Sequence, residues 1–368
     1  MDGLARVPVV GVLRPFARAF LVATVAISVV TIGLAWLVGA DPTLLFVVAA
    51  AAILGLAWLI GLATERLGAL TGPQVGGVLN ATFGNIAELI IAFFALQAGL
   101  TAVVKASLTG SIIGNLLLVL GASVLCGGIR NGIQRFDPRV AGSNAALLVV
   151  AAIGFFVPAI FAASAATEGQ GTITEESVLV ALLLIVGYVL SLVYSFRNAN
   201  RTLGGHEPAG EHGGPPWSRA TAVGVLLGAA ALLAVLSEIL VSSIEPFIAT
   251  FGLSEFFVGV VLIPTIGNLA EHVVAVQLAW KNRMEFSMAV AYGSSLQVAL
   301  FVGPVLVVLG ALAGQPMDLV FHPLEVAAVG AAVGISALIA LDGESNWLEG
   351  ALLMIVYVIL AVSFFELR

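Results

Sequence analysis

The sequence predicts an all-α protein that crosses a membrane many times, with eleven transmembrane helices. Of its 368 residues, 60% are hydrophobic and only 10% are charged, whereas soluble domains contain about 45 to 50% apolar and about 25% charged residues. Apolar runs of about 20 residues, the length of a membrane helix, recur along the whole chain. One of these runs reappears in the second half of the chain, which indicates an internal repeat.

The eleven apolar runs are separated by short breaks that contain Gly, Pro or charged residues. They are predicted at 17–38, 43–63, 73–97, 101–126, 140–163, 176–196, 220–242, 255–280, 286–312, 323–341 and 346–366. The first run is long and lacks a small-residue cleavage site, so we expect a retained helix rather than a secretory signal.

The positions of Lys and Arg predict the orientation, because these residues are enriched on the cytoplasmic side of short loops. With the N-terminus inside, 12 of them fall in cytoplasmic segments, and only Lys105 and Arg368 fall outside. We therefore expect a cytoplasmic N-terminus and an external C-terminus. The short loops and compact length favour the cell membrane over an organelle.

Composition also argues against several classes of protein. The net charge of -7 gives no indication of a nucleic-acid partner. The single cysteine, Cys126, excludes an intrachain disulfide and a cysteine-based metal site, and we expect it to pack in the core. The motifs HExxH and GxSxG are absent, and three of the four histidines lie outside the predicted membrane core, which disfavours an intramembrane enzyme.

The internal repeat relates two helices in each half by one offset. Residues 78–92 read VLNATFGNIAELIIA, and 183 positions later residues 261–275 read VLIPTIGNLAEHVVA, with 8 of 15 residues identical. The same offset aligns Gly110-Ser111 with Gly293-Ser294. The unit is about five spans long, and an odd number of spans inverts the second copy in the membrane. We predict an N-terminal segment with the extra helix at 1–40, repeats at 41–196 and 220–368, and a cytoplasmic linker at 197–219.

Two glutamates are predicted near the middle of the bilayer, where a charged side chain is costly and marks a functional site. They are Glu88 in the third span and Glu271 in the eighth. Polar residues precede each glutamate by three and six positions, a spacing that places them along one helical stripe. These residues are Asn85, Asn268, Thr82 and Thr265. Three residues are predicted to break the helices there, namely Gly84, Gly267 and Pro264.

This chemistry suits a hard divalent cation that competes with protons. Such an ion prefers six to eight oxygen ligands, and two carboxylates neutralise its charge. Without the ion, two carboxylates in a poorly solvated site favour protonation. Two alternatives remain: glutamates and asparagines that only bond helices together, and threonines that bond their own helix.

The fourth and ninth spans supply a second polar layer at a similar depth. Its members share helix faces in pairs and are expected to orient the glutamates or to contribute neutral oxygens, unless they serve only interhelical packing. They are Ser111, Asn115, Ser294 and Gln297. His272 and Glu238 are weaker candidates for moving protons. In the linker, His206, Glu207, Glu211 and His212 have the chemistry of a metal site, but its Gly and Pro content favours a solvated connector.

The motifs that carry these residues resemble those of the calcium/proton exchangers, also called cation/proton exchangers, in the calcium/cation antiporter superfamily. They are GNIAE at 84–88, GNLAEH at 267–272, GSIIGN at 110–115, GSSLQ at 293–297, and LSEIL followed by LSEFFVG within 236–259. The resemblance implies one extra helix plus two inverted five-helix halves. It also implies that Glu88 and Glu271 carry both calcium and protons, with the neighbouring polar residues lining the path. Asn115 and Gln297 stand where related sodium/calcium exchangers have other groups, which favours protons over sodium. The linker, in contrast, lacks the strongly acidic segment of many relatives.

The sequence therefore predicts a secondary antiporter that exports cytosolic Ca²⁺ in exchange for H⁺. Its expected partners are these transported ions and the lipid bilayer, with no other cofactor. A sodium-coupled or manganese-selective exchanger and a passive cation channel remain as alternatives. Exchange of two or of three protons per calcium ion also stays open.

Overall fold

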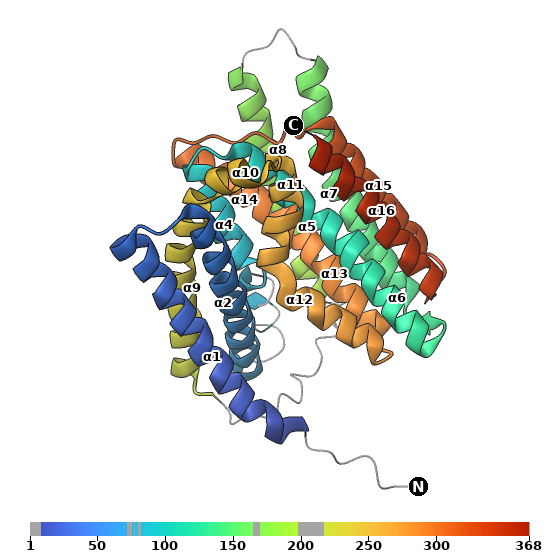
Figure 1. The fold of residues 1–368 in the computed structure, drawn as a ribbon. Helices are drawn as coiled ribbons and strands as arrows, with labels where there is room; N and C mark the ends of the chain where they lie inside the picture. Colours follow the sequence, from blue (N-terminus) through green and yellow to red (C-terminus); the bar gives the residue numbers. More distant parts are fainter. Residues whose placement is uncertain are drawn as a thin grey trace.

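The computed structural model describes residues 9–71, 76, 78–79, 82–164, 170–197 and 217–367. Within these ranges the fold is helical apart from one short pair of strands (Figure 1). In the first half the helices are α1 (Val9–Gly33), α2 (Pro42–Thr71), α4 (Ile86–Gln97), α5 (Thr101–Ile113), α6 (Leu120–Asn131), α7 (Pro138–Ser164) and α8 (Gln170–Arg197). In the second half they are α9 (Arg219–Ser242), α10 (Ile244–Phe251), α11 (Glu255–Phe257), α12 (Ile263–Trp280), α13 (Met284–Gln297), α14 (Gly303–Leu312), α15 (Pro323–Ile339) and α16 (Trp347–Glu366).

Four π-helical segments interrupt these helices, and three of them lie beside the polar residues singled out above. They are η1 (Leu34–Val38), η2 (Gly114–Val119), η3 (Val258–Leu262) and η4 (Val298–Val302). The segment η2 contains Asn115, η3 ends just before Pro264, and η4 begins directly after Gln297. Such segments often occur at functional sites because they locally widen the helix.

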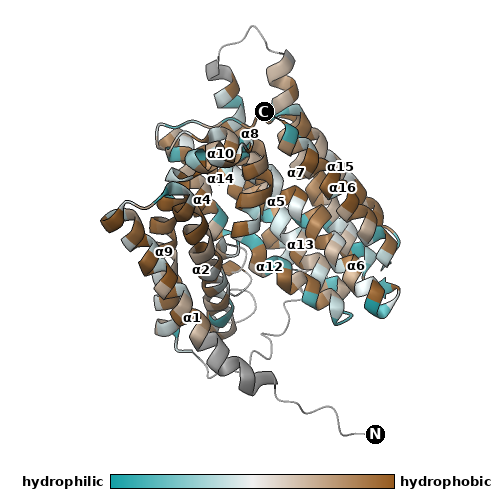
Figure 2. Ribbon diagram, in the orientation of Figure 1, coloured by the Kyte–Doolittle hydropathy of each residue, from teal (hydrophilic) through white to brown (hydrophobic). Residues whose placement is uncertain are grey.

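The described residues contain nine helical stretches that are long and apolar enough to cross a membrane. Two further apolar helices, Ile86–Gln97 and Pro323–Ile339, are shorter. Each of the eleven predicted runs contains helix, and part of the third run lies outside the described residues. Apolar residues cover the helix surfaces, and polar residues gather toward the helix ends (Figure 2). The exposed Leu, Ile and Val side chains of α7, α8 and α16 match a surface that contacts lipid. The chain is therefore a helical multi-pass membrane protein.

The helices form two groups around a central layer (Figure 1). On one side α1, α2 and α9 pack against one another, and on the other side α6 packs on α16, α7 on α15 and α8 on α14. Between them, α5 crosses η3 and α12, while α4 bridges α9, α5 and α14. The central layer therefore contains the spans that carry the repeated motifs of both halves.

The crossing of α5 and η3 brings the two backbones into direct contact. A Cβ atom on Gly110 would lie 2.3 Å from the carbonyl oxygen of Val260, and one on Gly259 would lie 2.4 Å from Cβ of Ala106. Glycine removes the side-chain volume that would otherwise separate the two helices, as is common in membrane proteins. The crossing fixes the first half against the second close to the repeated motifs.

The strand pair lies at the end of the molecule opposite the connection between α14 and α15. Strand β1 (Gln134–Arg135) pairs antiparallel with β2 (Glu344–Ser345). The buried Gln134 Nε2 also donates to the carbonyl oxygen of Ala279 at 2.9 Å and to Oδ1 of Asn282 at 3.0 Å. These bonds tie three helix ends together, those of α6, α12 and α15.

Candidate functional site

Glu88 lies in the first turn of α4, directly after a turn at Gly84 and Asn85. Its Oε1 atom accepts hydrogen bonds from Oγ of Ser111 and from Nδ2 of Asn268, each at 2.5 Å. Ser111 belongs to α5 in the first half, and Asn268 belongs to α12 in the second half. The Glu88 carboxyl group therefore joins both halves of the chain.

Glycine in α12 allows this approach. A Cβ atom on Gly267 would lie 3.0 Å from Cγ of Glu88, so the glutamate side chain rests directly on the α12 backbone. Glu271 lies four residues later on the same helix, and its carboxyl group interacts electrostatically with that of Glu88. Glu88 therefore packs on α12 about one helical turn from Glu271.

Glu271 lies near a serine that corresponds to the partner of Glu88. This residue is Ser294, which the repeat aligns with Ser111 and which interacts with the Glu271 side chain, while its hydroxyl donates to Oδ1 of Asn85. The Oε2 atoms of both glutamates are buried and have no hydrogen-bond partner among the described residues. Buried carboxylate oxygens without partners are unusual. They are the atoms that a bound cation or proton would satisfy.

Amide side chains complete the polar centre of the protein. Asn85 Nδ2 donates to Oε1 of Gln297 at 2.6 Å, and Asn115 Nδ2 donates to Oγ of Ser294 at 3.0 Å. Ser294 Oγ also lies 3.3 Å from Oδ1 of Asn85. Buried asparagine and serine residues therefore link α4, η2 and α13 around the two glutamates. The fold brings together all eight of the glutamate, asparagine, serine and glutamine residues proposed from the motifs.

The two threonines instead bond their own helices. Thr82 Oγ1 donates to the carbonyl oxygen of Val78 at 2.8 Å, and Thr265 Oγ1 donates to that of Val261 at 2.6 Å. This back-bonding is the alternative that the sequence left open. It occupies the single hydroxyl proton of each threonine, although each oxygen keeps a free lone pair.

The predicted helix breaks differ among the three positions. Gly84 lies in a turn before α4, and Pro264 lies in the first turn of α12 directly after η3. The expectation of a break at Gly267 is wrong, because α12 runs unbroken from Ile263 to Trp280. The irregular backbone precedes it in η3, and Gly267 instead provides space for Glu88.

The remaining candidates lie outside this centre or outside the described residues. Glu238 is exposed on α9, and His272 is half-buried on α12 next to Glu271. Cys126 is half-buried in α6. The four linker residues His206, Glu207, Glu211 and His212 lie outside the described residues.

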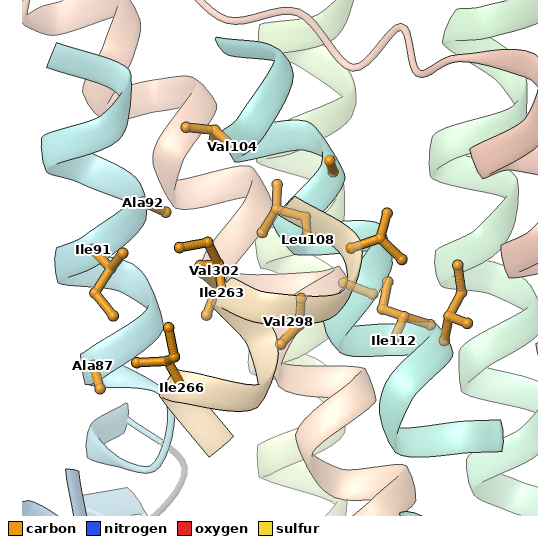
Figure 3. Close-up of a cluster of buried hydrophobic side chains, with 14 of the residues drawn as sticks. Ala87, Ile91, Ala92, Val104, Leu108, Ile112, Ile263, Ile266, Val298 and Val302 are labelled. Carbon is orange, nitrogen blue, oxygen red and sulfur yellow. The ribbon is translucent and has the colours of Figure 1, made fainter. Parts of the chain in front are cut away.

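A small cavity adjoins Glu88 on the side toward the C-terminal end of α4. Its apolar lining comes from α4, α5, α12 and η4 (Figure 3). These side chains are Ile91, Ala92, Leu108, Ile263, Val298 and Val302. Ser107 also lines the cavity but is missing from the sequence-based set. Its position four residues before Ser111 on one helix face is the signal that identifies it.

The donor set at this centre consists entirely of oxygen ligands. Two carboxylates, two serine hydroxyls and several amide oxygens are within reach, which suits a hard cation such as Ca²⁺. In the part of the chain that the structure describes, no three His, Cys, Asp or Glu side chains gather into one group. A cation held here would depend on the two glutamates plus neutral oxygens.

Comparison with known proteins places the chain in a family. Residues 42–197 and 221–365 match the model of the sodium/calcium exchanger protein family. The Ca²⁺/H⁺ antiporter of Aphanothece halophytica is 43% identical over 338 residues, which cover 88% of this chain and 91% of that protein. The Ca²⁺/H⁺ antiporter ChaA of Bacillus subtilis is 42% identical over 315 residues, covering 83% and 87%.

Solved structures agree with this assignment. The structure of native YfkE superposes with a TM-score of 0.80 at 37% identity and covers 94% of this chain and 99% of its own. The crystal structure of an H⁺/Ca²⁺ exchanger superposes with a TM-score of 0.71 at 18% identity, covering 95% and 93%, and shows the shared fold. The chain therefore belongs to the calcium/proton exchangers of the sodium/calcium exchanger protein family, and is a membrane transporter rather than an enzyme.

Proposed function

We propose that this protein exports cytosolic Ca²⁺ in exchange for H⁺, by alternating access to one site formed by Glu88 and Glu271. One observation carries the proposal. Each glutamate has a buried Oε2 atom without a hydrogen-bond partner among the described residues, and each interacts with a serine at the repeat-equivalent position, Ser111 through a hydrogen bond and Ser294 electrostatically. The name of the relatives, Ca²⁺/H⁺ antiporter, supports the choice of ions.

Charge balance explains why the two ions exclude each other. Two ionised carboxylates that interact in a buried site repel each other and lack the water that would stabilise them. A calcium ion cancels both charges and coordinates the two free Oε2 atoms. Two protons cancel the same charges by converting the carboxylates to carboxylic acids. Occupancy by one ion therefore requires release of the other, which is the basis of exchange.

The two halves act as inverted copies in this proposal. The contact between Ser111 and Glu88 and the contact between Ser294 and Glu271 are related by the same offset of 183 residues. We infer eleven membrane spans, with an extra helix at 1–40, repeats at 41–196 and 220–368, and a cytoplasmic linker at 197–219. The N-terminus is cytoplasmic and the C-terminus is outside, in a cell membrane.

This topology assigns a side to the apolar cavity lining. The chain runs outward along α4, so Ile91 and Ala92 lie on the outer side of Glu88. Leu108 and Ile263 lie there because α5 and α12 run inward and these residues precede the site. Val302 lies there because the chain runs outward from α13 through η4 (Figure 3). An apolar layer is a barrier to hydrated ions. We therefore infer a conformation that is closed toward the outside, in which Ca²⁺ would reach the glutamates from the cytosol.

The test is flux into proteoliposomes that contain a calcium-sensitive dye. An imposed pH gradient should drive Ca²⁺ uptake in sodium-free buffer, and Glu88→Gln or Glu271→Gln should abolish it. The matched control is Glu245→Gln, because Glu245 is an exposed carboxylate in α10. Uptake that requires sodium would favour the sodium-coupled alternative, and uptake that persists without any counter-gradient would indicate a channel. Competition with Mn²⁺ in the same assay measures divalent selectivity.

A further inference from the structure

A second polar cluster lies at the outer end of α5, away from the glutamate site. Lys105 Nζ donates to Oδ1 of Asp318 at 2.5 Å and to the carbonyl oxygen of Val320 at 2.8 Å. The two charged side chains are only 15% and 18% exposed, so water screens this ion pair less than a surface pair. Asp318 lies in the connection between α14 and α15, which belongs to the second half of the chain.

One turn further along α5, a buried carboxyl group makes a parallel link. Thr109 Oγ1 donates to Oε1 of Glu325 at 2.8 Å, and the backbone N–H of His322 donates to Oε2 at 2.9 Å. Glu325 is in the first turn of α15 and is 1% exposed. Lys105, Thr109, Asp318 and Glu325 together form what we call the outer clamp, which joins α5 to residues 318–325.

The outer clamp breaks the symmetry of the two halves. The repeat offset aligns Lys105 with Met288 and Thr109 with Tyr292, and Tyr292 bonds the carbonyl oxygen of Ser336 at 2.7 Å. The second half thus replaces a lysine with methionine and a carboxylate-bonded threonine with a tyrosine bonded to the backbone. Because the halves are inverted, the ionisable contact of α5 is present on one side of the membrane only.

The position of α5 connects the clamp to access. Thr109 and Ser111 are two residues apart and therefore lie about 200° apart around the helix. One face of α5 carries the clamp, while Ser107 and Leu108 line the cavity beside Glu88; Leu108 is labelled among the apolar side chains of Figure 3. Opening that cavity to the outside requires the outer half of α5 to separate from the helices around it. The clamp opposes this movement because it holds α5 to residues 318–325.

We propose that the outer clamp is a proton-sensitive latch that keeps the ion site closed to the outside until external acid releases it. Protonation of Glu325 weakens its acceptance of the Thr109 hydroxyl, while the ion pair of Lys105 with Asp318 sets how firmly the latch is held. Release at low external pH opens the site when external protons are abundant. A closed latch at high external pH prevents Ca²⁺ from returning. This use of the latch rests on the proposed function.

Other titratable groups lie near the latch. His322 Nδ1 accepts the backbone N–H of Leu324 at 3.2 Å. Packed elements contribute Glu255 of α11 and Glu366 of α16. Helix α8, whose Ser177 Oγ accepts the backbone N–H of Leu319, contributes Glu175 and Glu176. Glu176 is half-buried, and the other three are exposed.

The test measures access to Ser107 from outside. In a Cys126→Ser background, Ser107→Cys is labelled in right-side-out vesicles with a cationic, membrane-impermeant methanethiosulfonate reagent at one fixed pH. Lys105→Met, which installs the residue of the other repeat, should raise the labelling rate about tenfold. Glu325→Gln and Thr109→Val should raise it as well, while Thr109→Ser should keep the original rate. Arg135→Gln is the control, because Arg135 forms an ion pair elsewhere and is 81% exposed.

Charge effects on the reagent cannot mimic this pattern. Removing Lys105 favours a cationic reagent and removing Glu325 disfavours it, so a rise in both variants reports opening. A rate in both folded variants that matches the parent would overturn the proposal. So would a dependence of the labelling rate on external pH, measured by repeating the assay over a series of pH values, that is the same in the parent and in Glu325→Gln after correction for thiolate fraction. Labelling does not depend on flux, so failure of proton-driven uptake would refute the proposed function alone, and unchanged labelling would refute the latch alone.

Discussion

Replacing Gly267 with alanine tests whether the approach of Glu88 to α12 forms the ion site. The new Cβ atom would lie 3.0 Å from Cγ of Glu88, whereas carbon atoms pack best at about 3.5 to 4.0 Å. The glutamate side chain must therefore move by roughly 0.5 Å. The carboxyl group would then lose its alignment with Ser111 and Asn268, both of which bond it at 2.5 Å.

This displacement should harm ion binding more than folding. Overpacking lowers the free energy of unfolding by about 1 to 3 kcal/mol. The change from glycine to alanine in a helix raises it by about 0.5 to 1 kcal/mol. Metal ligands, in contrast, must stay within about 0.2 Å of their preferred distances. We expect the Ca²⁺ concentration for half-maximal uptake to rise at least about tenfold, which corresponds to about 1.4 kcal/mol.

The assay compares Gly267→Ala with Gly293→Ala in the dye-loaded proteoliposomes. A Cβ atom on Gly293, next to Ser294, would meet nothing within 4 Å, so that variant should transport like the parent. Thermal unfolding in detergent checks that both variants are folded. Equal Ca²⁺ dependence in the two variants would show that the Glu88 position on α12 is not needed for binding.

Three further predictions concern ligand linkage and packing. Ca²⁺ at about 100 times its Kd should stabilise the folded protein by about 2.7 kcal/mol and so raise its melting temperature. Glu271→Gln should remove this rise. A rise that is retained in the variant would place the ion elsewhere. Gln134→Ala should lower the free energy of unfolding by about 1 to 3 kcal/mol, because two bonds from a buried amide are lost. Arg135→Gln, at an exposed ion pair, should lower it by less than about 1 kcal/mol. Equal melting temperatures of the two variants would contradict this prediction. Gly350→Ala places a Cβ atom 2.2 Å from the backbone nitrogen of Leu125, so the variant should not give a monodisperse peak in size-exclusion chromatography. The control is Gly334→Ala, whose Cβ atom would meet nothing within 4 Å and which should behave like the parent.

Local patterns predicted the helices and most of the polar centre. Length and apolarity are properties of a segment, so each of the eleven predicted runs contains helix. The repeated motifs drew attention to Glu88 and Glu271 because the same residue types recur at one offset in both halves of the chain. Ser107 was missed because a serine in an apolar helix carries no signal until its neighbours are known. Its position on one face with Ser111 becomes informative only beside the cavity.

The role of Gly267 shows a second limit of local patterns. A glycine in a membrane helix predicts a break or a close contact equally well, and the sequence favoured the break. Which outcome occurs depends on what lies opposite, and the side chain opposite Gly267 is that of Glu88, which comes 179 residues earlier in the chain. Thr82 and Thr265 present the same difficulty, since a threonine hydroxyl can bond its own helix or reach across to another.

The sequence by itself determined the membrane class of this protein, its repeated halves and the residue types of its central site. These features follow from composition and spacing, which are properties of the chain before it folds. The tertiary structure alone decided which oxygen atoms lack partners among the described residues, which glycine admits a carboxyl group and which side chains bond α5 to residues 318–325. These depend on contacts between distant segments, whose distances are set by packing rather than by any local preference.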